Sequence, residues 1–297
     1  MRFPLGFCCV YFFCFIILGS LTSPAQAEIK KISAVASFSI IGDLVQKVGG
    51  DHVGVTMIVG PEEDAHVYQP SPADARKIAQ AEIIFINGLG FEGWLSRLIN
   101  VTKRKGIVVD LSKKIKAQER LGEVDPHVWQ DVNNVKIYTQ EICQALIAID
   151  PNNSADYQKN SQLYIETLSK LDNEIIESLA TIPLDDRRVV STHDAFGYFS
   201  ARYGIAFLAP QGVSTEAEAS ARDIARIIDA AKAQKVKAVF LENVADPRLA
   251  KRISAETKAH LGGTLYSDSL TSAKGDGGTY LEMMRHNVKE IVRALKP

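Results

Sequence analysis

Three histidines and one aspartate of this sequence stand where side chains could bind a metal ion. They are His66, His127, His193 and Asp268. Imidazole nitrogens and a carboxylate oxygen are donors that zinc, manganese and ferrous iron accept from proteins. Because the four residues come from distant parts of the chain, they can form one site only if the fold brings them together. Their chemistry predicts a site for one divalent transition-metal ion.

The local settings of these residues support that hypothesis. His66 lies in a polar loop that follows one strand-like run, and His193 and Asp268 follow two others. In open α/β sheets, ligands bind just beyond the carboxyl ends of the strands. Asp64 and Asp125 each precede a histidine by two residues, so their carboxylates could accept a hydrogen bond from the ring and select its tautomer.

The other histidines are interpreted differently, because a single histidine is more often solvated or hydrogen-bonded than bound to metal. We assign His52 to that class. We place His260 in the last turn of a helix, where its charge would complement the helix dipole. We expect His286 to be exposed on the polar side of the final helix.

Short apolar runs alternate with amphipathic stretches along the chain, a pattern typical of parallel βαβ units. The expected strands are 32–36, 53–59, 83–87, 107–111, 188–192, 205–208, 236–241 and 264–266. The expected helices are 40–48, 70–79, 93–100, 138–149, 195–203, 220–234, 247–260 and 279–295.

One stretch between the two halves is different. Residues 154–179 contain no glycine or proline, and their apolar residues recur at helical spacing. They predict one amphipathic helix about 40 Å long, which is too long to fit inside one small lobe. The fold class is therefore α/β with two lobes, each a small parallel sheet flanked by helices, joined by a long linker helix. The expected parts are an N-terminal lobe (28–150), the linker (151–182) and a C-terminal lobe (183–297).

The first 27 residues have the pattern of a secretory signal: Arg2, an almost wholly apolar run over 3–18, and small residues at Ala25 and Ala27. We predict cleavage after Ala27 and a periplasmic protein. The alternative, a permanent membrane anchor, is disfavoured because the run is shorter than the roughly 20 residues of a spanning helix. The residue directly after the predicted cut is Glu28 and not a cysteine, so no lipid anchor is expected. Cys143 alone cannot form an internal disulfide.

Composition limits the partners. The chain has 297 residues, 46% of them hydrophobic, and a formal net charge of −1. Without a basic excess we expect no nucleic-acid partner, and without a glycine-rich phosphate loop we expect no nucleotide. A monomer is expected.

The motifs around the histidines resemble a known family. They read Asp-x-His-x-Tyr-x-Pro-Ser around His66, Asp-Pro-His-x-Trp-x-Asp around His127 and His-Asp-Ala-Phe-Gly-Tyr-Phe from His193. Together they are similar to the ZnuA/TroA-like solute-binding proteins of zinc and manganese ABC importers, over essentially the whole mature chain. The resemblance implies two lobes with four-stranded parallel sheets and a metal ion in the cleft between them.

The same resemblance implies the roles of individual residues. His66 and His127 would come from the N-terminal lobe, and His193 and Asp268 from the C-terminal lobe. The assignment of Asp268 depends mainly on its place after a strand. Glu242 matches a glutamate often found there and is interpreted as a supporting residue. The partner would be the membrane permease of a metal ABC importer.

The sequence leaves the metal open between Mn²⁺ and Zn²⁺. Zinc-specific members often have a long histidine-rich loop before the second ligand motif, whereas residues 113–124 are short and contain no histidine. Many manganese binders have a glutamate where this chain has His193, and the resulting three nitrogens would hold zinc more tightly. The balance favours manganese slightly.

Two other functions compete with transport. The same histidines could hold a zinc ion that activates water in an exported hydrolase. An adhesion role ranks last, since the composition suggests no exposed adhesive surface. For transport we expect a modest lobe or loop movement that the linker helix limits.

Overall fold

The computed structural model describes residue 1 and residues 30–102, 104–120 and 122–296. Apart from Met1, the predicted signal segment lies outside the described residues. Residues from Lys31 onwards form one compact unit. Within the described ranges, no helix has both the length and the apolar character that crossing a bilayer requires.

Two parallel sheets of four strands each form the framework. The first has the strand order β2-β1-β3-β4 and the second the order β10-β9-β7-β8. A two-stranded antiparallel hairpin pairs β5 with β6. The strands are β1 (Ile32–Ala36), β2 (Val53–Met57), β3 (Ile83–Ile86), β4 (Ile107–Asp110), β5 (Gln118–Arg120), β6 (Glu123–Asp125), β7 (Arg188–Val190), β8 (Ala206–Leu208), β9 (Ala238–Glu242) and β10 (His260–Leu265).

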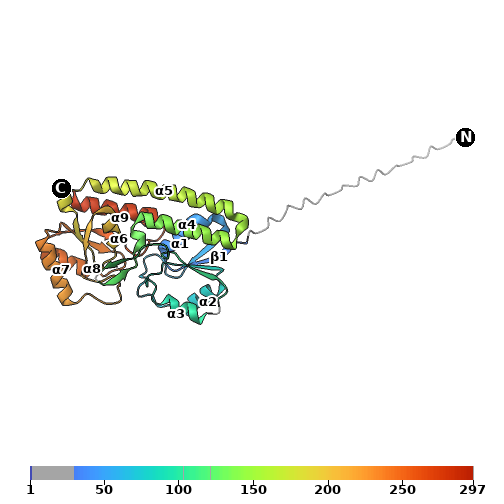
Figure 1. The fold of residues 1–297 in the computed structure, drawn as a ribbon, viewed down its shortest axis with the longest axis horizontal. Helices are drawn as coiled ribbons and strands as arrows, with labels where there is room; N and C mark the ends of the chain where they lie inside the picture. The colour runs from blue at the N-terminus through green and yellow to red at the C-terminus, as the bar shows by residue number, and fades with distance from the viewer. Residues whose placement is uncertain (2–29, 103, 121, 297) are drawn as a thin grey trace. The chain divides into compact units, whose positions relative to one another are not determined.

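Helices lie on the faces of both sheets (Figure 1), as crossover connections between parallel strands require. The central strands β3 and β9 are rich in Ile, Val and Phe because they are covered on both faces. The helices are α1 (Ser39–Gly49), α2 (Pro72–Gln80), α3 (Leu95–Val101), α4 (Val132–Ile149), α5 (Ser154–Ala180), α6 (Gly197–Tyr203), α7 (Ala221–Ala233), α8 (Pro247–Thr257) and α9 (Tyr280–Leu295). The predicted α/β class, with two small parallel sheets, is confirmed.

The long helix α5 is the predicted linker helix and ends one residue later than expected. In Figure 1 it runs along both halves of the described chain. It packs against α1 and α4 in the first half and against α6 and α9 in the second. Its buried side chains include Tyr157, Leu168, Leu171 and Ile175, at the spacing of one helical face. A single helix therefore contributes to the core on both sides.

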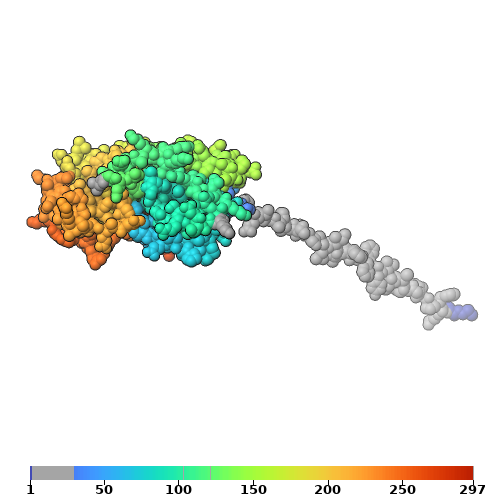
Figure 2. Space-filling view, turned by 60° about the horizontal axis from the view of Figure 1, so that its bottom comes forward, coloured from blue at the N-terminus to red at the C-terminus, as the bar shows by residue number. Residues whose placement is uncertain are grey.

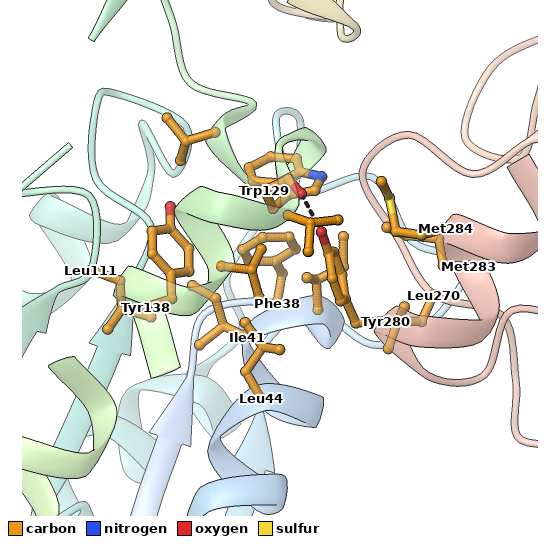
Figure 3. Packing of buried hydrophobic residues seen from close by; sticks show 14 of the residues in the cluster. Phe38, Ile41, Leu44, Leu111, Trp129, Tyr138, Leu270, Tyr280, Met283 and Met284 are labelled. Atoms are coloured by element: carbon orange, nitrogen blue, oxygen red, sulfur yellow. Dashed lines mark hydrogen bonds between the residues drawn. The ribbon is translucent and has the colours of Figure 1, made fainter. Parts of the chain in front are cut away.

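The two halves share one continuous hydrophobic core. In Figure 3, Phe38 and Trp129 from the first half lie beside Tyr280 at the start of α9. The hydroxyl of Tyr280 donates a hydrogen bond of 2.7 Å to the backbone carbonyl of Trp129. A second, smaller core lies between the second sheet and helices α7 and α8. The lobe boundaries at residues 150 and 182 stay predictions, because contacts run across both.

In the space-filling view, the cyan part of the first half and the orange part of the second lie next to each other with their surfaces in contact (Figure 2). Side chains rather than open solvent fill the junction, as the shared core requires. A metal site at this junction is therefore shielded from water on most sides.

The sequence prediction differs from the structure at the end of α8 and at the β5–β6 hairpin. Helix α8 ends at Thr257, because Lys258 adopts a left-handed conformation (φ 62°) that ends the helix. His260 is consequently the first residue of β10, and the helix-dipole role assigned to it does not apply. The hairpin β5–β6 was not predicted, because three-residue strands give too little alternation to recognise.

His286 is also not the exposed residue that was expected. Its side chain is 12% exposed, and Nδ1 lies 2.9 Å from an oxygen of Asp276. Nε2 lies 2.8 Å from the carbonyl oxygen of Thr264 in β10, and the ring stacks on Tyr266 with centroids 4.3 Å apart. His286 therefore fastens α9 to the second sheet.

Because α5 carries core residues of both halves, truncating one of them should destabilise the whole unit. We expect Leu168→Ala to lower the free energy of unfolding by about 2–5 kcal/mol, since Leu168 is fully buried. The matched control is Leu163→Ala on the same helix, where the side chain is 53% exposed and the change should stay within about 0.5 kcal/mol. Denaturant unfolding measures both, and equal effects would contradict the packing role of α5.

Candidate metal centre

His66 lies in the loop between β2 and α2. The backbone N–H of His66 donates to Asp64 Oδ1 at 2.9 Å, and the hydroxyl of Thr215 donates to Asp64 Oδ2 at 2.7 Å. Asp64 therefore orders the loop through its backbone and ties it to the second half. The prediction that Asp64 accepts a hydrogen bond from the imidazole ring was wrong. At the end of the loop, Ser71 and Asp74 form a capping box that sets where α2 begins.

His127 follows the hairpin strand β6. One oxygen of Asp125 accepts both the backbone N–H of His127 at 2.9 Å and the ring Nδ1–H at 2.8 Å. The donation from Nδ1 leaves Nε2 with a free lone pair directed into the site. The predicted role of Asp125 in selecting the tautomer is confirmed. The amide of Asn87 donates to the carbonyl of Pro126 at 2.9 Å and fixes the preceding turn.

His193 stands just beyond β7, beside Glu242 at the end of the neighbouring strand β9. Nδ1 of His193 lies 2.7 Å from Glu242 Oε2. The other oxygen, Oε1, accepts the backbone N–H of Thr192 at 2.7 Å and that of His193 at 3.1 Å. Glu242 thus holds the ring and the backbone of His193 together. Oε2 of Glu242 contacts Nδ1 of His193, while Nε2 of the ring faces Asp268. This arrangement agrees with the supporting role expected for Glu242.

Asp268 follows β10 of the second sheet, yet residues of the first half hold its loop. The carbonyl of Ser267 accepts hydrogen bonds from Trp129 Nε1 and Gln130 Nε2, both at 2.8 Å. The N–H of Leu270 donates to the hydroxyl of Ser39 at 3.0 Å. The resemblance assigned Asp268 to the C-terminal lobe, and in sequence it belongs there, but its position depends on both halves.

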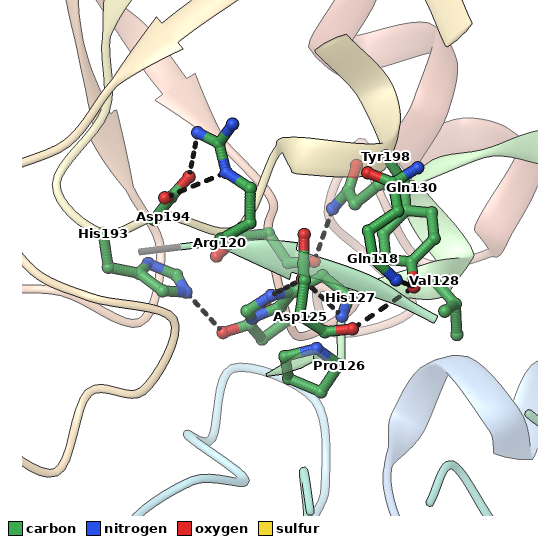
Figure 4. A network of polar contacts seen from close by, with 12 residues as sticks. Gln118, Arg120, Asp125, Pro126, His127, Val128, Gln130, His193, Asp194 and Tyr198 are labelled. Carbon is green, nitrogen blue, oxygen red and sulfur yellow. Dashed lines mark hydrogen bonds and ion pairs between the residues drawn. The ribbon is translucent and has the colours of Figure 1, made fainter. Parts of the chain in front are cut away.

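The four predicted side chains converge. Each offers one donor atom, and all four atoms lie within 4.8 Å of one another. Nε2 of His193 is 3.0 Å from Asp268 Oδ2, and Nε2 of His66 is 3.5 Å from the same oxygen. His127 Nε2 lies 3.5 Å from Asp268 Oδ1. In Figure 4 the rings of His127 and His193 approach each other from the two halves.

These separations suit a small ion. A tetrahedral ion with bonds of about 2.0–2.1 Å holds its ligand atoms about 3.4 Å apart. The Nε2 atoms of His66 and His127 are 3.3 Å apart, close to that value. Asp268 Oδ1, Asp268 Oδ2 and His193 Nε2 are buried, and the contacts that they make among the described residues are with other donors of the cluster. Buried polar atoms are normally satisfied, so this arrangement fits a bound cation.

Burial and charge act against each other in this cluster. Burial by itself lowers the pKa of His193, but the carboxylates of Glu242 and Asp268 outweigh it and hold the pKa well above its usual range. Burial raises the pKa of Asp268, and His193 and His127 outweigh that effect and lower it far below the ordinary value. The carboxylates therefore favour a protonated His193, and the imidazoles favour an ionised Asp268.

Sequence reasoning missed one contact between the halves. Arg120, at the end of β5, donates two hydrogen bonds to Asp194, at 3.1 and 2.9 Å (Figure 4). On the same side, a Cβ at Gly197 would lie 2.3 Å from Asp125 Oδ2, so only glycine lets α6 approach the His127 turn. Asp194 and Gly197 belong to the third motif, but nothing in the sequence pattern identifies Arg120 as their neighbour.

The remaining histidines lie outside the cluster. Nε2 of His52 is 2.8 Å from an oxygen of Asp156, which agrees with its assignment as a hydrogen-bonded residue. His260 begins β10, and His286 holds α9 on the second sheet. Among the described residues, the donor atoms that close into one metal-sized group are those of the four predicted side chains.

Comparisons with known proteins agree with this geometry. Residues 34–294 match the family described as "Zinc-uptake complex component A periplasmic". The chain is 32% identical over 266 residues to the manganese-binding lipoprotein MntA of Halalkalibacterium halodurans, covering 89% of this chain and 88% of that protein. It is 31% identical over 285 residues to the manganese ABC transporter substrate-binding lipoprotein PsaA of Streptococcus pneumoniae, covering 91% of each.

Solved structures show the same fold. The periplasmic zinc binding protein TroA from Treponema pallidum superposes with a TM-score of 0.86 at 30% identity, covering 90% of this chain and all of that one. The Mn-bound periplasmic metal binding protein from Candidatus Liberibacter asiaticus gives 0.82 at 30% identity with the same coverage. With a family match over nearly all of the described fold, the chain belongs to the ZnuA family of periplasmic components of zinc-uptake complexes.

Proposed function

We propose that this protein captures one Mn²⁺ or Zn²⁺ ion with His66, His127, His193 and Asp268 and delivers it to the membrane permease of an ABC importer. The observation that carries the proposal is the convergence of four donor atoms within 4.8 Å in a buried cluster. Family membership supports it, because the matched family and the named relatives are substrate-binding components of metal uptake systems.

The donor set bears on the choice of metal. Three imidazole nitrogens and one carboxylate favour zinc over manganese in intrinsic affinity. The named relatives include both manganese-binding and zinc-binding proteins, so metal supply and site geometry must also contribute to selection. Metal analysis of protein purified without added metal, followed by competition calorimetry with the two ions, tests the proposal. Protein that binds neither ion would refute it.

The hydrolase alternative is not supported. The family is the substrate-binding component of importers. A catalytic zinc site usually keeps one position open for water, whereas here a fourth protein donor, the Asp268 carboxylate, lies among the three imidazoles and is fully buried. The cluster is built to hold an ion rather than to expose it to a substrate.

Export follows from the family, whose description is periplasmic. We further propose that residues 1–27 are a signal removed after Ala27 and that the mature protein acts as a monomer in the periplasm. MntA of Halalkalibacterium halodurans and PsaA of Streptococcus pneumoniae are lipoproteins by name, whereas TroA of Treponema pallidum is named a periplasmic protein. Mass spectrometry of the exported protein tests this part, because a mature chain starting at Glu28 is expected and a lipid-modified or uncleaved chain would contradict it.

Removing a ligand should abolish tight binding. We expect His127→Ala and Asp268→Ala each to lower metal affinity by more than the 10- to 100-fold that loss of a supporting partner typically costs. His52→Ala and His260→Ala are matched controls outside the cluster and should bind as the unmodified protein does. Calorimetry with Zn²⁺ and Mn²⁺ gives the affinities, and tight binding by Asp268→Ala would exclude Asp268 as a ligand.

Glu242 should act through His193 rather than on the metal. We expect Glu242→Gln to lower affinity by roughly 10- to 100-fold, because the ring of His193 loses its charged partner. Asp125→Asn should do the same through His127. The Co²⁺-substituted variants should keep the absorption spectrum of the unmodified site, since its ligands are unchanged. A spectrum showing a lost ligand would make Glu242 itself a donor.

Metal binding should release protons. Because the pKa of His193 is raised in the metal-free site, this imidazole is protonated at neutral pH and must lose its proton to bind an ion. We therefore expect about one proton released per metal at pH 7, and an affinity that falls as pH decreases below the raised pKa. Calorimetry in buffers of different ionisation enthalpy counts the protons, and buffer-independent heats would contradict the prediction.

A further inference from the structure

A cavity of about 570 Å³, open to the surface, has one of the proposed metal donors in its wall. Its wall contains Tyr68 and Pro70 from the His66 loop and Trp94 and Leu98 from the region of α3. His66 itself forms part of the wall. The cavity therefore connects a proposed metal donor to solvent.

His66 is the donor best placed to meet an ion arriving from water. Its side chain is 3% exposed, whereas those of His127, His193 and Asp268 are fully buried. None of the three buried donors lines this cavity.

The other cavities do not reach a donor. One of about 460 Å³ touches Asp64 and Thr192, which are neighbours of ligands in sequence, but none of the four donors lines it. Another, of about 560 Å³, lies between α5 and α9, away from the site. Of these three cavities, the one beside His66 is the one whose wall contains a proposed donor.

Two opposite charges line the same cavity. Arg97 comes from α3 in the first half, and Glu216 comes from the segment between β8 and α7 in the second. Both side chains are exposed. A Cβ placed on Gly93 would lie 3.8 Å from Glu216 Oε1, so Glu216 reaches across the junction to the start of the α3 region. The missing side chain at Gly93 helps to keep the passage wide.

We propose that this cavity is the route by which a hydrated divalent cation reaches and leaves the site, with His66 as its first contact. Glu216 attracts the ion at the mouth, Arg97 repels it, and Gly93 leaves the passage open. The inference rests on the proposed function and adds to it the path and the residues that control the rate. Substitutions in the passage should change rates of binding rather than the bound site itself.

A bulky side chain placed in the cavity tests the route. Gly93→Phe adds a ring into the cavity without touching a donor, and Gly93 has no positive φ that would strain another residue. We expect the association and dissociation rates of Mn²⁺ and Zn²⁺ to fall by the same factor, at least about threefold, with the equilibrium affinity unchanged. Ala245→Phe, in the cavity that reaches no donor, is the matched control and should leave both rates unchanged.

Substitutions that remove the charges of Glu216 and Arg97 test the mouth of the cavity. They add no bulk that could disturb folding. At low ionic strength, Glu216→Gln should slow association and Arg97→Gln should speed it, each by roughly threefold, as expected for one unit charge acting on a divalent ion about 10 Å away in water. Both effects should disappear at about 1 M salt, where the Debye length falls to about 3 Å. Glu218→Gln and Arg252→Gln, in the other cavity, are the charge controls.

Stopped-flow mixing of the metal-free protein with MnCl₂ or ZnCl₂ measures all rates, and calorimetry gives the affinities. If the unmodified protein binds neither ion, the proposed function and the route both fail. If it binds but Gly93→Phe and the substitutions of Glu216 and Arg97 leave the rates unchanged, the route is overturned while the function stands. If Ala245→Phe, Glu218→Gln or Arg252→Gln changes the rates, the proposed route is also overturned, and the cavity lined by these residues is favoured instead.

Discussion

The buried carboxylate of Asp268 is the constraint on which the rest of the site depends. A lone carboxylate in an apolar interior carries a large desolvation cost, so it must be paired or coordinated. Here imidazoles surround it, and the closest contact is 3.0 Å, from His193. Glu242 and Asp268 raise the pKa of His193, so the site favours a positive charge beside the carboxylate. A bound cation would supply the same charge.

Holding such a cluster together requires supports from both halves of the chain. Glu242 orders His193, and Asp125 orders His127, each through the nitrogen that faces away from the site. Trp129 and Gln130 of the first half fix the loop of Asp268 in the second. The shared core around Tyr280 and the long helix α5 then hold the two halves together. The fold thus brings four donors from both halves of the chain into one cluster.

A buried site has a kinetic consequence. Tight packing at the junction protects the ion from water, but it also limits how quickly an ion can enter or leave. The cavity beside His66 offers a passage that avoids opening the whole junction. Its charged residues, Arg97 and Glu216, come from opposite halves, so a small movement between the halves would change the passage as well as the site. Capture and release can therefore be tuned without rebuilding the ligands.

Much of this followed from the sequence. The alternation of apolar runs indicated parallel βαβ units, and the uninterrupted stretch 154–179 indicated the helix now seen as α5, because these are local patterns set by hydrophobic periodicity. The motifs around His66, His127 and His193 named three of the converging donors. The local pattern gave a wrong prediction at His260, because Lys258 ends the helix early. It gave no prediction for β5 and β6, because these strands are too short to show alternation.

What the sequence by itself determined was the chemistry available: three imidazoles, one carboxylate and the strands and helices that carry them. The tertiary structure alone decided their partners. Asp64 binds the backbone of His66 rather than its ring, Arg120 meets Asp194 across the junction, and His286 packs against β10. The contacts of Arg120 and His286 join residues far apart in the chain, and no local spacing encodes them. They arise only when two sheets and a shared helix pack around one buried charge.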